Sequence, residues 1–311
     1  KMEIQTSLIL RIVAGITVTV GGLVATGGTG LVLLLRRISG SVGLAKPTPA
    51  MLKEEDPAKN CALFRHLPQL VESLAWRSLG SQRQTPIHVC KLSLSTNNNK
   101  EQQQQQQQVL EFLLKREDLI SKEYGGNKVR TLQHQLAVCE SRREAGENAF
   151  RQLVSVGSGG SNQVVATVVH ARKLGWDGKA NDVNACWFDK DKPDLDNTLN
   201  LLSVLSFSNV GFTYDWGTTS GLLRTVRAIR DAWSQTDMIP MFLGGNCPAG
   251  VLGQAGGVLE LAEQIVAGDS PDPTRIYVPI GSGCTVSGLI LGTVLVRHLG
   301  LKALSKPEFK I

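Results

Sequence analysis

The sequence lacks the clustered cysteines and histidines that metal sites and disulfide frameworks need. Its six cysteines lie 29 or more residues apart, no C-x-x-C pair occurs, and the chain has only five histidines. Zinc sites and small disulfide-bonded folds both require closely spaced ligands or cysteines. We therefore expect free thiols, no metal site and no disulfide framework.

Aromatic residues are also scarce, and neither sign of charge dominates the body of the chain. Phe, Tyr and Trp make up 5% of the 311 residues, whereas hydrophobic residues make up 42%. The net charge of +6 comes mostly from residues 1–53, which contribute +5 and leave +1 for residues 54–311. Nucleic-acid affinity comes largely from a basic surface that neutralises phosphates. This distribution therefore argues against nucleic-acid binding.

An uncharged run of 24 residues spans positions 12–35, and Arg36 and Arg37 follow it directly. A helix of that length can cross a bilayer, so a membrane anchor is the first interpretation. The alternatives are a basic, acid-poor targeting leader for a mitochondrion or plastid, a non-native N-terminus, or a cytoplasmic protein. We divide the chain into an N-terminal segment with a linker, residues 1–60, and a main region, residues 61–311.

The segment 61–80 has apolar residues at helical spacing and is expected to pack on the main region. Residues 93–108 include seven consecutive glutamines and are expected to form an exposed, low-complexity insertion.

Beyond Val109, short apolar runs alternate with longer amphipathic stretches. The predicted strands are 109–115, 150–156, 184–189, 210–214, 238–243 and 275–280. The predicted helices are 126–143, 162–174, 197–207, 219–234, 250–267 and 285–299. This alternation indicates an α/β fold with a largely parallel sheet, whose ligands bind beyond the carboxyl ends of the strands.

Lys128 follows Gly125, Gly126 and Asn127 at the predicted start of a helix. The positive end of a helix dipole lowers the cost of deprotonating an ammonium group there. Such an amine can form a Schiff base with an aldehyde. The alternative is an ordinary solvated lysine.

Two glycine-rich turns also follow predicted strands. Residues 157–162 read GSGGSN, and residues 281–285 read GSGCT. The amides at a helix N-terminus bind carboxylates and phosphates, and glycines let the ligand approach the backbone. The second turn has neither a Walker A lysine nor dinucleotide G-x-G-x-x-G spacing, which favours a phosphate monoester. The Lys128 amine, the anion-binding turn 157–162 and the phosphate-binding turn 281–285, called the phosphate cup below, together indicate pyridoxal 5'-phosphate (PLP).

The ordered motifs resemble the tryptophan-synthase-β-like PLP enzymes, specifically the branch of 1-aminocyclopropane-1-carboxylate (ACC) deaminase and D-cysteine desulfhydrase. The resemblance runs through residues 85–92 (TPIHVCKL), 115–118 (KRED), 125–128 (GGNK), 160–163 (GSNQ), 242–246 (FLGGN) and 281–285 (GSGCT). It implies an α/β fold of two open, largely parallel twisted sheets flanked by helices, incomplete at the C-terminus. It also implies that residues 61–311 are the catalytic region.

The resemblance assigns roles to residues of this chain. Lys128 would form the Schiff base with PLP and move protons, and Asn127 would bind the cofactor. Asn162 would contact the ring hydroxyl, and Ser161 would take part in proton transfer. The substrate would be held by Gly160, Ser161, Asn162 and Gln163. The phosphate would be held by Gly281, Ser282, Gly283, Cys284 and Thr285.

Three departures from the family pattern matter. Residues 157–162 replace the usual Gly-Gly-Ile-Gln-Ser-Asn, and Cys284 stands where Gly or Ser is common. The chain ends at Ile311, whereas its relatives continue. We therefore expect a truncated gene model or a fragment that lacks the partner of the pyridine nitrogen.

These observations favour a PLP-dependent lyase that converts D-cysteine to pyruvate, sulfide and ammonia. The alternative is ACC deaminase, which opens a ring to give 2-oxobutyrate and ammonia and is the more demanding chemistry. An alternative of another class is a truncated, non-catalytic homologue that binds PLP. The expected partners are a small amino-acid substrate and a second copy of the chain in a homodimer.

Overall fold

A computed structural model describes most of the chain from residue 43 onward. The described ranges are 43–80, 84–95, 107–145, 152–158, 161–176, 183–189, 195–207, 209–215, 238–241 and 243–311. The hydrophobic run 12–35, the predicted helix 219–234, most of the glutamine-rich insertion and Gly160 lie outside these ranges. Within them, no helix combines the length and the apolar character needed to cross a membrane.

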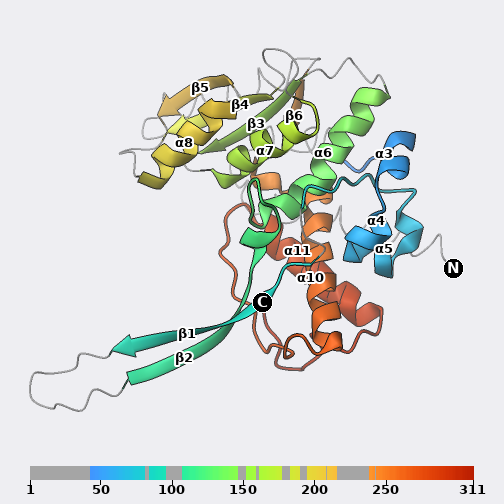
Figure 1. Cartoon of the computed structure of the whole chain (residues 1–311), viewed down its shortest axis with the longest axis vertical. Helices are drawn as coiled ribbons and strands as arrows, with labels where there is room; N and C mark the ends of the chain where they lie inside the picture. The colour runs from blue at the N-terminus through green and yellow to red at the C-terminus, as the bar shows by residue number, and fades with distance from the viewer. Residues whose placement is uncertain are drawn as a thin grey trace, which may run out of the picture.

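A four-stranded parallel sheet forms one part of the molecule (Figure 1). Its strands are β3 (Gln152–Ser158), β4 (Val183–Asp189), β5 (Asn209–Asp215) and β6 (Met238–Met241), in the order β5-β4-β3-β6. Helix α7 (Asn162–Lys173) joins β3 toward β4, and α8 (Leu195–Phe207) joins β4 toward β5. These elements confirm the βαβ alternation read from the sequence, because each pair of neighbouring strands runs parallel.

Three long helices form the second part: α6 (Lys128–Glu144), α10 (Pro248–Ala267) and α11 (Cys284–His298). Helices α10 and α11 pack closely because α11 carries glycines at the contact. A Cβ atom at Gly288 would collide with Gln254, and one at Gly292 would collide with Val258. The N-terminal part of the described chain completes this apolar core through Leu63, Phe64 and other buried side chains.

Residues 49–70 form short helices instead of the predicted linker and helix. These are α3 (Pro49–Glu54), α4 (Pro57–Asn60), α5 (Ala62–His66) and the 3-10 turn η1 (Pro68–Leu70). Pro68 disfavours a helical conformation at Leu67, whose φ is −131° and ψ 63°, so α5 ends there. The predicted packing of 61–80 is confirmed, since Leu67, Leu70 and Leu74 are buried.

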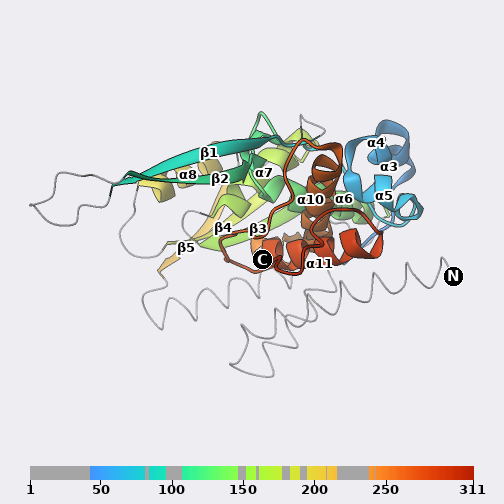
Figure 2. The ribbon, with the colours of Figure 1, turned by 90° about the horizontal axis from the view of Figure 1, so that it is seen from below.

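The run 109–115 does not join the parallel sheet. Strand β2 (Gln107–Lys115) pairs antiparallel with β1 (Ile87–Ser95) in a separate two-stranded hairpin, which projects beyond α10 and α11 (Figures 1 and 2). Directly opposed residues share a face, and one face carries the pairs His88–Leu114, Cys90–Phe112 and Leu92–Leu110. Leu92, Leu110, Phe112 and Leu114 are exposed on that face.

The prediction of a strand at 275–280 is also wrong. Only Arg275 makes a β-bridge, to Lys310, and the rest of the segment has no ladder in the described part of the chain. Tyr277 is 85% exposed and Ile280 is 72% exposed. An apolar run becomes a strand only where a neighbouring strand supplies backbone partners, and none of the described strands lies alongside this one.

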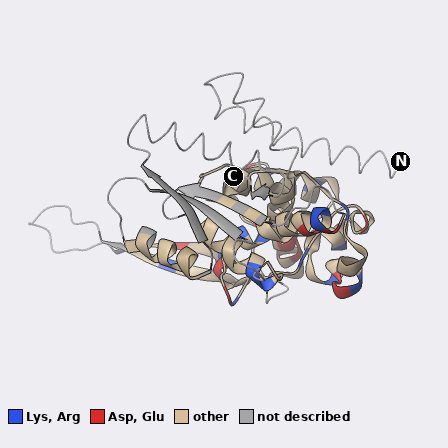
Figure 3. Ribbon diagram, turned by 90° about the horizontal axis from the view of Figure 1, so that it is seen from above, with Lys and Arg blue, Asp and Glu red and all other residues tan. Residues whose placement is uncertain are grey.

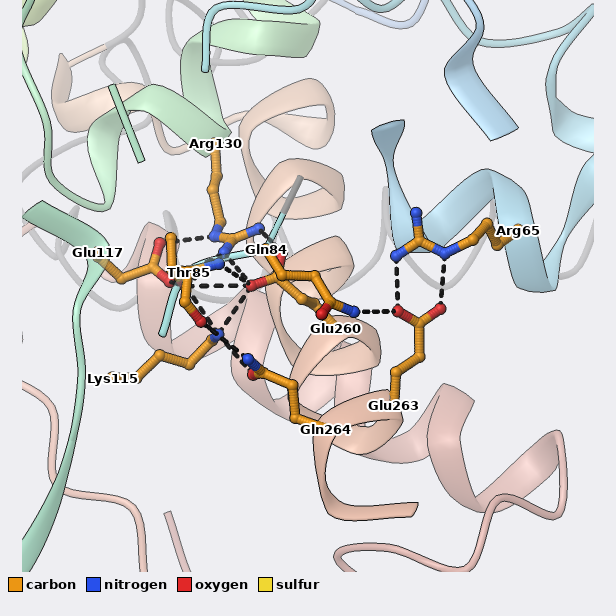
Figure 4. A network of polar contacts seen from close by, with 9 residues as sticks. All are labelled: Arg65, Gln84, Thr85, Lys115, Glu117, Arg130, Glu260, Glu263 and Gln264. Atoms are coloured by element: carbon orange, nitrogen blue, oxygen red, sulfur yellow. Dashed lines mark hydrogen bonds and ion pairs between the residues drawn. The ribbon is translucent and has the colours of Figure 1, made fainter. Parts of the chain in front are cut away.

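A network of buried charges joins the hairpin to the helices (Figure 4). Arg130 on α6 donates to Glu117 in the 3-10 turn η2 (Glu117–Leu119) at 2.6 Å and to Glu260 on α10 at 2.9 and 3.0 Å. Lys115, the last residue of β2, donates to Glu260 at 2.8 Å and to Gln264 at 2.9 Å. Charges of both signs are mixed along the described ribbon (Figure 3), and this cluster buries several of them together.

Replacing Glu260 with Gln is expected to cost about 3–5 kcal/mol of unfolding free energy, because it leaves Arg130 buried without its full counter-charge. Burial raises the pKa of the Glu260 carboxyl, but the charges of Arg130 and Lys115 outweigh burial and lower it from 4.5 to about 2. This stabilisation is therefore complete above the unfolded-state pKa near 4.5 and is lost as the pH falls toward 2. Urea unfolding across that window measures both effects.

The matched control is Glu111→Gln, since Glu111 pairs with Lys91 at 3.3 Å while both side chains are more than half exposed. That pair should contribute no more than about 1 kcal/mol. Equal losses in the two variants, or an unchanged acid profile in Glu260→Gln, would contradict the role given to the buried network.

Candidate functional site

Three turns that are far apart in the sequence meet at one backbone oxygen. They are the start of α6 at Lys128, the turn η4 (Leu243–Gly245) between β6 and α10, and the loop 281–285 before α11. The Gly244 carbonyl oxygen accepts from Lys128 Nζ at 3.1 Å and from Ser282 Oγ at 3.1 Å. The structure thus brings together the predicted amine and the predicted phosphate cup.

Lys128 is the first residue of α6 and is half-buried. Burial lowers the pKa of its amine, and the nearby Cys284 sulfur opposes that shift. Burial also raises the pKa of Cys284 to about 12, so this sulfur is a neutral thiol near pH 7 and does not hold the ammonium as an anion would. Within the described residues Lys128 forms no ion pair. A desolvated amine without a counter-ion is more readily deprotonated and therefore more nucleophilic.

The loop 281–285 has the features of an anion site. Gly283 is left-handed, with φ of 85°, and α11 begins at the next residue. The first amides of a helix have no intrahelical acceptor, so they point toward the loop unpaired. Gly281 has open space where a Cβ atom would stand. These backbone donors and the Ser282 and Thr285 hydroxyls suit a phosphate monoester.

Asn127 and Asn246 each donate a hydrogen bond to this loop. Asn127 Nδ2 donates to Thr285 Oγ1 at 2.8 Å, and Asn246 Nδ2 donates to the Ser282 carbonyl at 2.7 Å. Of the residues predicted from sequence, the structure therefore gathers Lys128, Asn127, Ser282, Cys284 and Thr285 around one small region.

The predicted substrate-binding turn reaches this region through intermediaries. Asn162 Oδ1 accepts from Tyr124 Oη at 3.0 Å, and Tyr124 precedes the GGNK turn. Ser161 stands at the N-cap of α7 without a side-chain capping bond, so its hydroxyl does not serve the helix. Gln163 is buried and donates to Gln135 at 3.4 Å. The catalytic and substrate-binding roles of these residues stay predictions.

No role was predicted for Gly244, Asn246 or Tyr124. The sequence feature that points to Gly244 and Asn246 is the pair of glycines followed by asparagine after β6, in the motif FLGGN. Gly244 has φ of 60° and Gly245 has φ of 74°, a left-handed conformation that favours glycine at both positions. Two such residues in sequence turn their carbonyls toward the 281–285 loop, where Ser282 and Cys284 donate to them.

Proteins of similar sequence match about 60% of the chain. A Pyrococcus horikoshii protein named "Putative 1-aminocyclopropane-1-carboxylate deaminase" is 30% identical over 188 residues, 60% of this chain and 52% of that protein. Nocardicin C-9' epimerase of Nocardia uniformis subsp. tsuyamanensis is 30% identical over 187 residues, 59% of this chain and 53% of that protein. The chain thus spans about half the length of these relatives.

No protein-family model matches the chain. A solved structure described as an ACC deaminase homologue superposes with a TM-score of 0.49 and 21% identity, covering 78% of this chain and 63% of that one. A likeness at this level adds no functional argument. These sequence relatives support the resemblance of the chain to the family of ACC deaminase and D-cysteine desulfhydrase, whose cofactor is PLP.

Proposed function

We propose that the protein uses PLP to deaminate a small amino acid or to eliminate a group from it. The observation that supports this proposal is the single carbonyl of Gly244, which holds both the Lys128 amine and the Ser282 hydroxyl. PLP, when bound, supplies an aldehyde for the amine, a phosphate for the loop, and a ring that withdraws electrons from the substrate. The spacing of the amine and the loop around one residue suits a ligand that carries both groups.

The residues of this chain have separable tasks in that reaction. The 281–285 loop would hold the phosphate through helix amides and hydroxyls. Lys128 Nζ would be the amine that holds the cofactor and would move a proton to or from the substrate carbon. Ser161, at the start of α7, is proposed to bind the substrate carboxylate or to transfer a proton. Asn162 lies beside Tyr124 and is proposed to contact the ring hydroxyl.

The finer proposal is a D-cysteine desulfhydrase, with ACC deaminase as the second candidate. Two relatives are named for different activities, a deaminase and an epimerase. Sequence similarity therefore does not determine which reaction this chain would catalyse. D-Cysteine needs only removal of a proton and departure of thiolate, whereas ACC needs a ring carbon bond to break. The simpler chemistry favours D-cysteine.

Mixing the protein with PLP is expected to give a visible absorption band that is absent from Lys128→Ala. Because burial lowers the Lys128 pKa, the band should form at a lower pH than the reaction of PLP with a free alkyl amine. Lys122→Ala is the control and should retain the band. A band that persists in Lys128→Ala would show that another residue holds PLP and would contradict the proposal.

With PLP bound, the protein is expected to release sulfide from D-cysteine faster than it releases 2-oxobutyrate from ACC. Lys128→Ala should lose both activities, since a nucleophile of this kind acts in every turnover. A preference for ACC would favour the second candidate. PLP binding without any product from either substrate would favour a non-catalytic homologue.

We also propose that the protein is a homodimer. The exposed row of Leu92, Leu110, Phe112 and Leu114 on the hairpin carries no Lys, Arg, Asp or Glu, so it can pack on the same row of a second copy about a two-fold axis. Phe112→Glu should shift the sedimentation coefficient toward that of a monomer. Glu111→Gln, on the opposite face, should not; identical sedimentation of both variants and the unaltered protein would rule out this surface.

A further inference from the structure

The turn 243–246 is fitted tightly between three other elements. A Cβ atom at Gly244 would collide with the Ser282 side chain, and one at Gly245 would collide with Thr131 on α6. A Cβ atom at Gly250 on α10 would collide with the Gly245 carbonyl. The backbone of this turn therefore has little freedom to move relative to α6, α10 or the 281–285 loop.

Asn246 ends the turn and is 5% exposed. Its Nδ2 donates to the Ser282 carbonyl at 2.7 Å, and this contact fixes the orientation of the amide because a carbonyl can only accept. Its Oδ1 is buried and has no donor among the described residues. An acceptor that is buried without a donor destabilises the folded protein. A side chain retained only for stability would be better apolar, so the Nδ2 contact is the specific contribution of Asn246.

Hydrogen bonds between the turn and the loop run in both directions. Asn246 donates from the turn to the loop, whereas Ser282 Oγ and Cys284 Sγ donate from the loop to the Gly244 and Gly245 carbonyls, the latter at 3.2 Å. If the Asn246 donor is removed, only side chains of the loop hold it to the turn. Of these side chains, Ser282 is the one that a bound phosphate would draw away from the turn, since Ser282 Oγ has a single proton to donate.

We propose that Asn246 is a positioning residue for the phosphate-binding loop, acting through the Ser282 carbonyl. When the Ser282 hydroxyl turns from Gly244 to a phosphate, the Asn246 bond keeps the loop backbone in place and leaves the Gly244 carbonyl for the Lys128 amine. Asn246 thereby contributes to the binding of ligands that carry a phosphate and not to the attachment of an aldehyde as such. This inference rests on the proposed function, because it takes PLP as the ligand.

The test compares PLP with pyridoxal, which has the same aldehyde but no phosphate. Asn246→Leu has nearly the same shape, removes the Nδ2 donor and also removes the orphan Oδ1, so a loss of binding need not follow from a loss of stability. We expect Asn246→Leu to weaken PLP binding about tenfold, as loss of about 1.4 kcal/mol predicts, and to leave pyridoxal binding unchanged. The visible absorption of each ligand gives both dissociation constants.

Ser287→Ala is the control, because Ser287 Oγ, like Asn246 Oδ1, is buried without a hydrogen-bond partner among the described residues, but it gives no side-chain hydrogen bond to the 281–285 loop. It should change neither dissociation constant. Should Asn246→Leu fail to fold, Asn246→Asp keeps the shape, replaces the donor with an acceptor and should show the same selective loss.

An equal loss for PLP and pyridoxal, or no loss for either, would overturn the role of Asn246 while leaving the proposed function in place. Absence of any reaction of the unaltered protein with both aldehydes would instead overturn the proposed function, and this inference with it.

Discussion

The position of the candidate site depends on the ion pairs of the buried Arg130 guanidinium. Arg130 lies two residues after Lys128 on α6 and is held by Glu117 and Glu260. Helix α10 carries glycine where α6 crosses it, and a Cβ atom at Gly253 would collide with the Arg130 carbonyl. Charge pairing and close helix contact therefore fix the same turn of α6. A displacement of that turn would expose an unpaired charge to the apolar interior, which is costly.

The site itself lies where two apolar clusters meet. One cluster includes side chains of α6, α7 and β3, and the other includes side chains of α5, α10 and α11. The turn 243–246 follows the last described strand and leads directly into α10. Its carbonyls face the start of α11, while Lys128 reaches it from α6. A shift between the two clusters would therefore alter the distance between the amine and the loop.

The sequence predicted the parts of the fold that depend on local pattern. The βαβ alternation, the start of α6 at Lys128 and the start of α11 after Gly283 follow from hydrophobic periodicity and glycine placement. The run 109–115 was correctly predicted as a strand, but it pairs antiparallel with β1 instead of joining the parallel sheet. The segment 275–280 was wrongly predicted as a strand, because strand pairing depends on residues outside the local pattern. Gly244 and Asn246 were visible in the motif FLGGN, but their contacts need a turn, a loop and a helix from separate parts of the chain. The motif KRED is in part structural, since Lys115 and Glu117 serve the buried network.

The meeting of Lys128, Gly244 and Ser282 has a consequence for biosynthesis. These residues are separated by more than a hundred positions from first to last, and the ribosome delivers Lys128 long before Ser282. Domains fold as their residues emerge, N-terminal parts first. During translation α6 is therefore present before the 281–285 loop exists. The contacts of the Gly244 carbonyl with both Lys128 and Ser282 can be complete only after the start of α11 has left the ribosome.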